Sequence, residues 1–152
     1  MNKPAALSVD VVIPVFNAPE LTKRCIDSVM SHLKQSIEAV YVQDDASSDE
    51  TRAMLDDLRY PQVHIYHAPE NQGFGKSVND AVARSDADLV FVLNSDTEID
   101  EDFLPVLCAA FVADPELAAI SPGHKNFFRH ELERYLRRPG GYVQTYRVKG
   151  HA

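Results

Sequence analysis

Short runs of β-branched and other apolar residues alternate along this chain with segments whose apolar residues recur every three or four positions. Each run is long enough for a strand and too short for a buried helix. Four such runs are clear, at residues 8–15, 37–43, 63–67 and 89–93. Strands of this solidly apolar kind, separated by helices, predict a mainly parallel sheet covered on both faces, a three-layer α/β/α domain.

Length and composition narrow the class of protein further. The chain has 152 residues, and no linker, repeat or low-complexity segment interrupts it, so we expect one domain over residues 1–152. A net charge of −8 argues against nucleic acid as a partner. The first residues do not have the pattern of a signal peptide, and no apolar run approaches the roughly 20 residues of a membrane span. Two cysteines without metal-ligand spacing favour a reducing cytoplasmic setting.

Local signals predict several element boundaries. Ser47 followed by Glu50 has the spacing of a capping box, which predicts a helix over 51–59. Acidic residues at 100–102 would suit the first turn of a helix over 100–113. Further on, the pattern indicates a helix over 127–138 and a strand over 142–148.

Clusters of polar residues follow the four predicted strands, at residues 14–17, 44–48, 71–76 and 94–98. In an open parallel sheet the carboxyl ends of the strands share one edge, and ligands bind in the crevice there. Several carboxylates in one crevice repel each other unless a cation is present. Oxygen-only ligands suit Mg²⁺ or Mn²⁺, which complete their shell with water and substrate phosphates, so the pattern predicts a metal-assisted nucleotide site. The carboxylates concerned are Asp44, Asp45, Asp96 and Glu98.

Each polar cluster also has a simpler structural interpretation. Residues 44–48 are of the types that form turns and cap helices, and Lys76 on its own is an ordinary solvated cation. Gly75-Lys76-Ser77 is like the end of a phosphate-binding P-loop, but the first glycine of that motif would fall on Glu70. The third glycine of a dinucleotide-binding fingerprint is missing as well. A P-loop and a dinucleotide-binding site are therefore excluded. The prediction of a metal-assisted nucleotide site depends on all four polar clusters lying at one edge of the sheet.

The four clusters lie in the segments VVIPVFN (11–17), VQDDASSDET (42–51), ENQGFGKSVN (70–79) and VLNSDTE (92–98). Taken together, these segments resemble the family 2 glycosyltransferases, which have the GT-A fold. The resemblance covers about residues 8 to 100, and the last motif, Leu-Asn-Ser-Asp-Thr-Glu, is similar to the branch that contains rhamnosyltransferases.

The resemblance implies a role for each matching residue. Asp45 matches the acid that accepts the imide N–H of the base, which favours UDP or dTDP, and residues 71–76 match the loop that closes over the diphosphate. Asn94-Ser95-Asp96 stands at the family's Asp-x-Asp motif, which leaves Asp96 as the metal ligand with Glu98 as its neighbour. The nucleotide-sugar contacts implied are Pro14, Phe16, Asn17, Asp45, Asn71, Gly73, Lys76 and Ser95.

The implied activity is metal-assisted, inverting transfer of a sugar from its nucleoside diphosphate to a glycan or lipid-linked acceptor. In the family, the general base lies in a later block of the chain, and Asp114, Glu131 and Glu133 do not have the setting of a substitute. We therefore expect the donor-binding part of a longer protein, cytoplasmic or peripheral at the inner face of the membrane. Apolar surface exposed by truncation would favour homo-oligomers. The alternative is a module that binds a nucleotide sugar without catalysis. Nucleotidyl transfer is disfavoured because residues 14–17 lack the glycine-rich loop that it needs.

Overall fold

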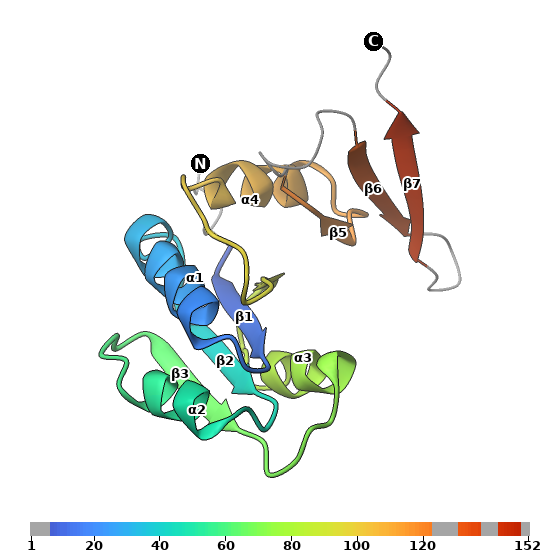
Figure 1. Cartoon of the computed structure of the whole chain (residues 1–152). Coiled ribbons are helices and arrows are strands. Elements are labelled where there is room, and N and C mark those ends of the chain that lie inside the picture. Colours follow the sequence, from blue (N-terminus) through green and yellow to red (C-terminus); the bar gives the residue numbers. More distant parts are fainter. Residues whose placement is uncertain (1–6, 123–130, 138–142, 150–152) are drawn as a thin grey trace. The chain divides into compact units, whose positions relative to one another are not determined.

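The computed structural model describes residues 7–122, 131–137 and 143–149 (Figure 1). The chain divides into two compact units, residues 1–102 and residues 103–152. The first contains β1 (Val9–Val15), α1 (Pro19–His32), β2 (Val40–Asp44), α2 (Asp49–Asp56), β3 (Val63–His67), α3 (Phe74–Val82) and β4 (Leu89–Val92). The second contains α4 (Leu104–Ala113), β5 (Ala119–Ile120), β6 (Glu131–Arg137) and β7 (Val143–Lys149).

The first unit is built on a four-stranded sheet in the order β3-β2-β1-β4, and every strand pair is parallel. Val15 pairs with Asp44, and Asp44 pairs with His67, so β1, β2 and β3 end side by side. We call the edge where the four strands end the carboxyl edge. The parallel sheet predicted from the apolar runs is confirmed.

Helices cover both faces of this sheet. Neighbouring side chains of a strand point to opposite faces. Gln43 accepts a hydrogen bond from Arg84, two residues beyond α3, whereas the adjacent Asp44 lies within 3.9 Å of Arg52 on α2. Figure 1 shows α2 beside α1 and α3 apart from them. The unit is therefore a three-layer α/β/α structure, as the sequence predicts.

The core of the unit centres on β1, in which all seven residues are buried. Ile13 of β1 and Ile26 of α1 are fully buried, as are Leu33 and Leu55. One charged residue, Asp10, lies within this strand, but its carboxylate accepts hydrogen bonds from the Ala39 N–H at 3.0 Å and the Ser85 hydroxyl at 2.6 Å. Burial of apolar side chains around the central strand fixes the sheet on which the loops of the carboxyl edge stand.

The second unit differs from the sequence prediction in one element. Residues 131–137 form β6, which pairs antiparallel with β5 and β7, so the predicted helix is wrong over that range. Residues 127–130 and 138 lie outside the described residues. A strand of this kind depends on partners distant in sequence, which local periodicity does not register. The predicted strand over 142–148 is confirmed as β7 from Val143 onward.

Helix α4 begins at Leu104, later than predicted, and its first turn contains no acidic residue. One of the acids assigned to that turn, Asp102, accepts a hydrogen bond from the hydroxyl of Ser36. Among the described residues, none of the helices has both the length and the apolar character needed to cross a bilayer.

Candidate functional site

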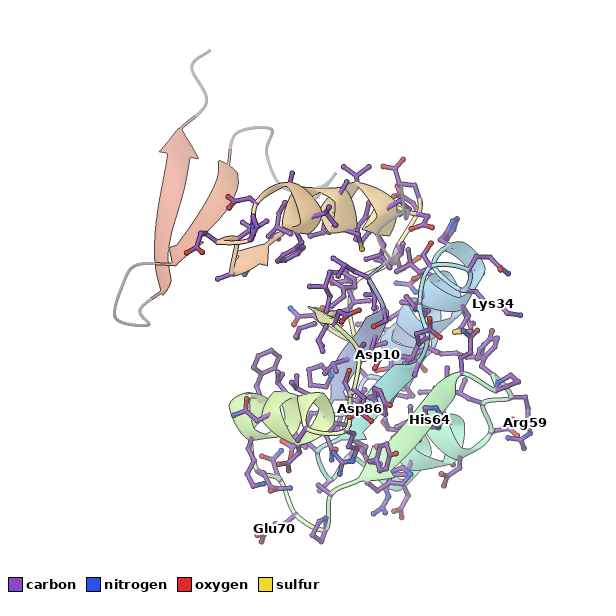
Figure 2. All side chains as sticks on the ribbon, turned by 180° about the vertical axis from the view of Figure 1, so that it is seen from behind. Asp10, Lys34, Arg59, His64, Glu70 and Asp86 are labelled. Atoms are coloured by element: carbon purple, nitrogen blue, oxygen red, sulfur yellow. The ribbon has the colours of Figure 1, made fainter. Side chains whose placement is uncertain are left out.

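Four loops leave the carboxyl edge of the sheet, and they contain the predicted site residues except Pro14, which lies near the end of β1, and Lys76, which lies in the first turn of α3. In Figure 2, Glu70 marks the loop after β3 at this edge, and Lys34 and Arg59 mark the opposite end of the unit. Because the strands are parallel, the segments 16–18, 44–48, 68–73 and 93–98 start from the same edge.

Asp45 joins the loop after β2 to the loop after β3. Its side chain is almost fully buried, with the residue 4% exposed. One carboxylate oxygen accepts the Gln72 N–H at 2.7 Å, and the other accepts the Gly73 N–H at 2.8 Å. The amide of Asn71 donates to the Asp45 carbonyl at 3.3 Å. A carboxylate offers about four acceptor positions, so these two bonds leave it further capacity for an N–H of a ligand.

Asn17 and Ser47 join the loop after β1 to the loop after β2. The Asn17 N–H donates to the Ser47 hydroxyl at 2.8 Å, and the Ser48 N–H donates to the Asn17 side chain at 2.8 Å. The predicted capping box is therefore wrong: Ser48 is the cap residue of α2, and the Ser47 hydroxyl accepts from Asn17 instead. Asn17 has a φ of 62°, a conformation that asparagine tolerates better than most residues.

The other predicted nucleotide contacts differ in exposure. Pro14 is buried within β1, whereas Phe16 is 55% exposed at the end of that strand, where its ring is accessible to a planar ligand. Lys76 is exposed on the first turn of α3 and forms an ion pair with Asp80 at 2.8 Å. Ser95 is half-buried in the loop after β4.

The loop after β4 is held by α1. The Cys25 thiol donates to the Asn94 carbonyl at 3.5 Å, and the Ile99 N–H donates to the Ser28 hydroxyl at 2.9 Å. Between these attachments, Asp96 is exposed, and its carboxylate has no hydrogen bond or ion pair with any described residue. Glu98 is exposed too, but it forms an ion pair with Arg24 at 3.1 Å.

Burial, with smaller contributions from the charges of Asp96 and Glu98, raises the pKa of the Cys25 thiol to about 12, against the opposing effect of a hydrogen bond with the Thr97 backbone. Cys25 therefore stays a neutral thiol at physiological pH. It supports the loop beneath the two acids without adding a negative charge.

Asp44 does not share the exposure of Asp96 and Glu98 at the carboxyl edge. It is fully buried and faces α2, where one carboxylate oxygen accepts the Ser47 N–H at 3.0 Å. The other oxygen lies 2.7 Å from Nδ1 of His67. The contact between Asp44 and His67 is apparent only once β2 and β3 are paired in register.

The acids of the edge offer a limited set of metal ligands. Within the described part of the chain, no three His, Cys, Asp or Glu side chains gather closely enough to hold a metal ion. Asp96 is an accessible carboxylate that is not paired with any described residue, and Glu98 follows two residues later. One or two carboxylates completed by water and phosphate oxygens are what Mg²⁺ typically accepts, so the donor set fits a hard divalent cation that binds together with its substrate.

Substitution of Gly73, at the end of the loop after β3, and of Gly75, in α3, tests the backbone conformation of this region. Gly73 has φ 84° and ψ 160°, a region open almost only to glycine, and a Cβ at either position would meet nothing within 4 Å. We expect Gly73→Ala to lower the free energy of unfolding by about 1–3 kcal/mol through backbone strain. Gly75→Ala, within α3, is expected to raise it by about 0.5 kcal/mol. Urea denaturation measures both, and equal effects of the two changes would contradict the assigned Gly73 conformation.

A three-layer α/β/α unit with polar, acidic loops along one edge of a parallel sheet is characteristic of GT-A domains, and the comparisons agree with that class. The chain belongs to glycosyl transferase family 2, whose profile matches residues 10–150. This confirms the resemblance drawn from the four clusters.

Curated relatives are sugar-transferring enzymes that are much longer than this chain. An N-acetylglucosaminyltransferase of Rhizobium sp. (strain N33) is 34% identical over 116 residues, which cover 74% of this chain and 26% of the relative. Chondroitin synthase of Pasteurella multocida (strain Pm70) is 28% identical over 120 residues, 78% of this chain and 12% of the relative. The chain therefore spans about a quarter or less of these relatives.

Two solved structures share the fold. The mannosyltransferase PcManGT from Pyrobaculum calidifontis, in complex with GDP-Man and Mn²⁺, superimposes with a TM-score of 0.67 at 20% identity, over 80% of this chain and 37% of that one. Residues 1–349 of S. aureus TarS superimpose with a TM-score of 0.63 at 19% identity, over 82% of this chain and 41% of that one. The GT-A fold predicted from the sequence is confirmed.

Proposed function

We propose that this chain is the donor-binding part of a glycosyltransferase that moves a sugar from a nucleoside diphosphate to a glycan or lipid-linked acceptor with inversion. One observation carries the proposal: the exposed carboxylate of Asp96, which no described residue pairs with, lies at the edge where Asp45 joins two other loops. The curated relatives include an N-acetylglucosaminyltransferase and a chondroitin synthase, which supports sugar transfer as the reaction class.

Different residues of the carboxyl edge would contact different parts of the nucleotide-sugar donor. In the proposed complex the exposed ring of Phe16 stacks on the base, next to the turn that Asn17 fastens, and Pro14 shapes the strand end beneath it. Asp45 accepts the imide N–H of uracil or thymine with its remaining lone pairs. The loop of Asn71 and Gly73, held by Asp45, closes over the nucleotide.

The diphosphate lies between α3 and the loop after β4 in this proposal. Lys76 exchanges Asp80 for a phosphate oxygen, and Ser95 lines the loop on the other side. Asp96 and Glu98 would hold Mg²⁺ or Mn²⁺, which supplies a Lewis acid for the charge that develops on the leaving diphosphate. Glu98 reaches the cation only if it leaves Arg24, so Asp96 is the principal ligand. PcManGT, which shares the fold, is in complex with GDP-Man and Mn²⁺.

An acceptor hydroxyl must lose its proton when it attacks the sugar, and a carboxylate performs this step as general base in inverting enzymes of this kind. We propose that this base belongs to a longer protein of which the chain is a part, working in the cytoplasm or peripherally at the inner face of the membrane. Self-association of the chain is part of the same proposal. The second candidate is a nucleotide-sugar-binding module without catalysis.

Calorimetric titration of the 152-residue chain with UDP, dTDP and GDP, with and without Mn²⁺, tests the donor site. We expect Mn²⁺-dependent binding, with UDP or dTDP preferred to GDP because only their bases present the imide N–H to Asp45 in the expected pose. A folded sample that binds none of the three would contradict both candidate functions. Assays of donor hydrolysis and of sugar transfer then separate the enzyme from the binding module.

A further inference from the structure

His67 lies between two carboxylates at the point where β3 ends. Its Nδ1 lies 2.7 Å from an oxygen of Asp44 on β2, and its Nε2 lies 3.1 Å from an oxygen of Asp56 on α2. The His67 side chain is 20% exposed, Asp44 is fully buried, and the Asp56 side chain is 68% exposed. One ring thus connects a buried strand residue with the surface of a helix.

These two contacts specify the protonation state of the ring. An ionised carboxylate only accepts hydrogen bonds, and a neutral imidazole has one donor nitrogen and one acceptor nitrogen. Only the imidazolium can donate to both acids at once. Burial lowers the pKa of His67, but the hydrogen bonds and the negative charges of Asp44 and Asp56 outweigh it and raise the pKa above 6.5. Arg52 on α2 also faces this cluster, 3.9 Å from the same Asp44 oxygen.

The bridge supports the turn from which the donor site is built. The second oxygen of Asp44 accepts the Ser47 N–H, and the Ser47 hydroxyl accepts the Asn17 N–H of the neighbouring loop. Asp45, next in the chain, holds the loop after β3. A change in the position of the Asp44 carboxylate is therefore transmitted to both of the loops that flank the nucleobase in the proposed complex.

We propose that His67 is a positioning residue: as an imidazolium it clamps Asp44 to α2 and so holds the turn of residues 44–48, and loss of its proton loosens that turn and weakens nucleotide binding. The expected effect on nucleotide binding rests on the proposed function, whereas the expected loosening of the turn of residues 44–48 does not. Because the folded protein binds the His67 proton more tightly than the unfolded chain does, the clamp makes its full contribution to the free energy of unfolding below pH 6.5. Its contribution is lost as the pH rises through the higher pKa of the folded state.

Asp56→Asn isolates the clamp with little risk to folding, because Asp56 is exposed and the change removes one charge from the side of the ring away from Asp44. The matched control is Asp57→Asn, which alters the adjacent exposed acid, paired with Arg59. Ring ¹⁵N and ¹³C shifts follow His67 between pH 5 and 9 in wild-type, Asp56→Asn and Asp57→Asn chains. Amide-exchange protection of Ser47 and the affinity for UDP with Mn²⁺ are measured over the same range.

The proposal expects His67 to titrate above pH 6.5 with both nitrogens protonated on the acid side. Ser47 protection and UDP affinity should fall severalfold through the same midpoint, all three midpoints should move to lower pH in Asp56→Asn, and Asp57→Asn should match the wild type. A His67 midpoint at or below 6.5 would overturn the proposal. So would a lowered His67 midpoint in Asp56→Asn that leaves Ser47 protection unchanged. If UDP binds at no pH, the proposed function fails, and Ser47 protection alone decides whether the clamp exists.

Discussion

Replacement of Asp96 by alanine is expected to abolish the metal dependence of nucleotide binding while leaving the fold intact. Asp96 has no hydrogen bond or ion pair with any described residue, so its removal breaks no polar contact in the described part of the chain. Glu98, held by Arg24, is the only other acid proposed as a ligand, and it does not replace the lost carboxylate. Calorimetric titration of the variant with UDP should therefore give the same dissociation constant with and without Mn²⁺.

Asp86→Ala provides the matched control for that experiment. Asp86 is likewise an exposed aspartate, but it precedes β4 and so belongs to the amino end of the strand whose carboxyl end carries Asp96. Its replacement is expected to leave both affinity and metal dependence unchanged. If Asp96→Ala binds UDP with the Mn²⁺ dependence of the wild type, the assignment of the metal ligand is wrong. Unchanged thermal unfolding of both variants shows that any effect is local.

Replacement of Asp45 by alanine is expected to cost both stability and affinity. The Gln72 and Gly73 N–H groups lose their acceptor, and a hydrogen bond to a charged group contributes about 1.5–3 kcal/mol. Because water reaches part of this region once the carboxylate is gone, we expect the free energy of unfolding to fall by about 2–4 kcal/mol. Urea denaturation measures this loss, and calorimetry should show weaker UDP binding because the loop over the base is no longer held.

Asp57→Ala is the comparison for Asp45→Ala, since it removes an exposed acid whose ion pair with Arg59 contributes little. Destabilisation of Asp45→Ala no larger than that of Asp57→Ala would contradict the anchoring role. Weaker binding of UDP and GDP by the same factor would indicate that Asp45 acts through the loop alone and does not contact the base.

The first unit was predictable because its strands are short, apolar and separated by amphipathic helices. That pattern specifies a parallel sheet, and a parallel sheet places the four polar loops at one edge. The second unit was less predictable: β6 exists because β5 and β7 pair with it, and its own sequence also suits a helix. Local periodicity carries no information about partners that lie elsewhere in the chain.

The sequence predicts that the acids of the site lie at the carboxyl edge of the sheet. It does not predict which residues each acid contacts. Asp44 and Asp45 are adjacent, yet one faces α2 and His67 while the other receives the amides of the loop after β3. The alternation of side chains along β2 separates them, and the register with β3 selects His67 as the partner of Asp44. The pairing of Glu98 with Arg24 likewise depends on how α1 packs against the loop after β4.

In the proposed site Asp45 would recognise the base as well as hold the loop after β3, and this limits how the nucleotide choice can be re-engineered. A substitution that aims to admit a different nucleobase at this position also releases the main chain of the loop after β3. Phe16 presents less of this conflict, because the residue is 55% exposed and its side chain accepts no main-chain N–H. Variant libraries for altered nucleotide choice should therefore begin at Phe16 and leave Asp45 fixed, so that selectivity and foldability can be varied separately.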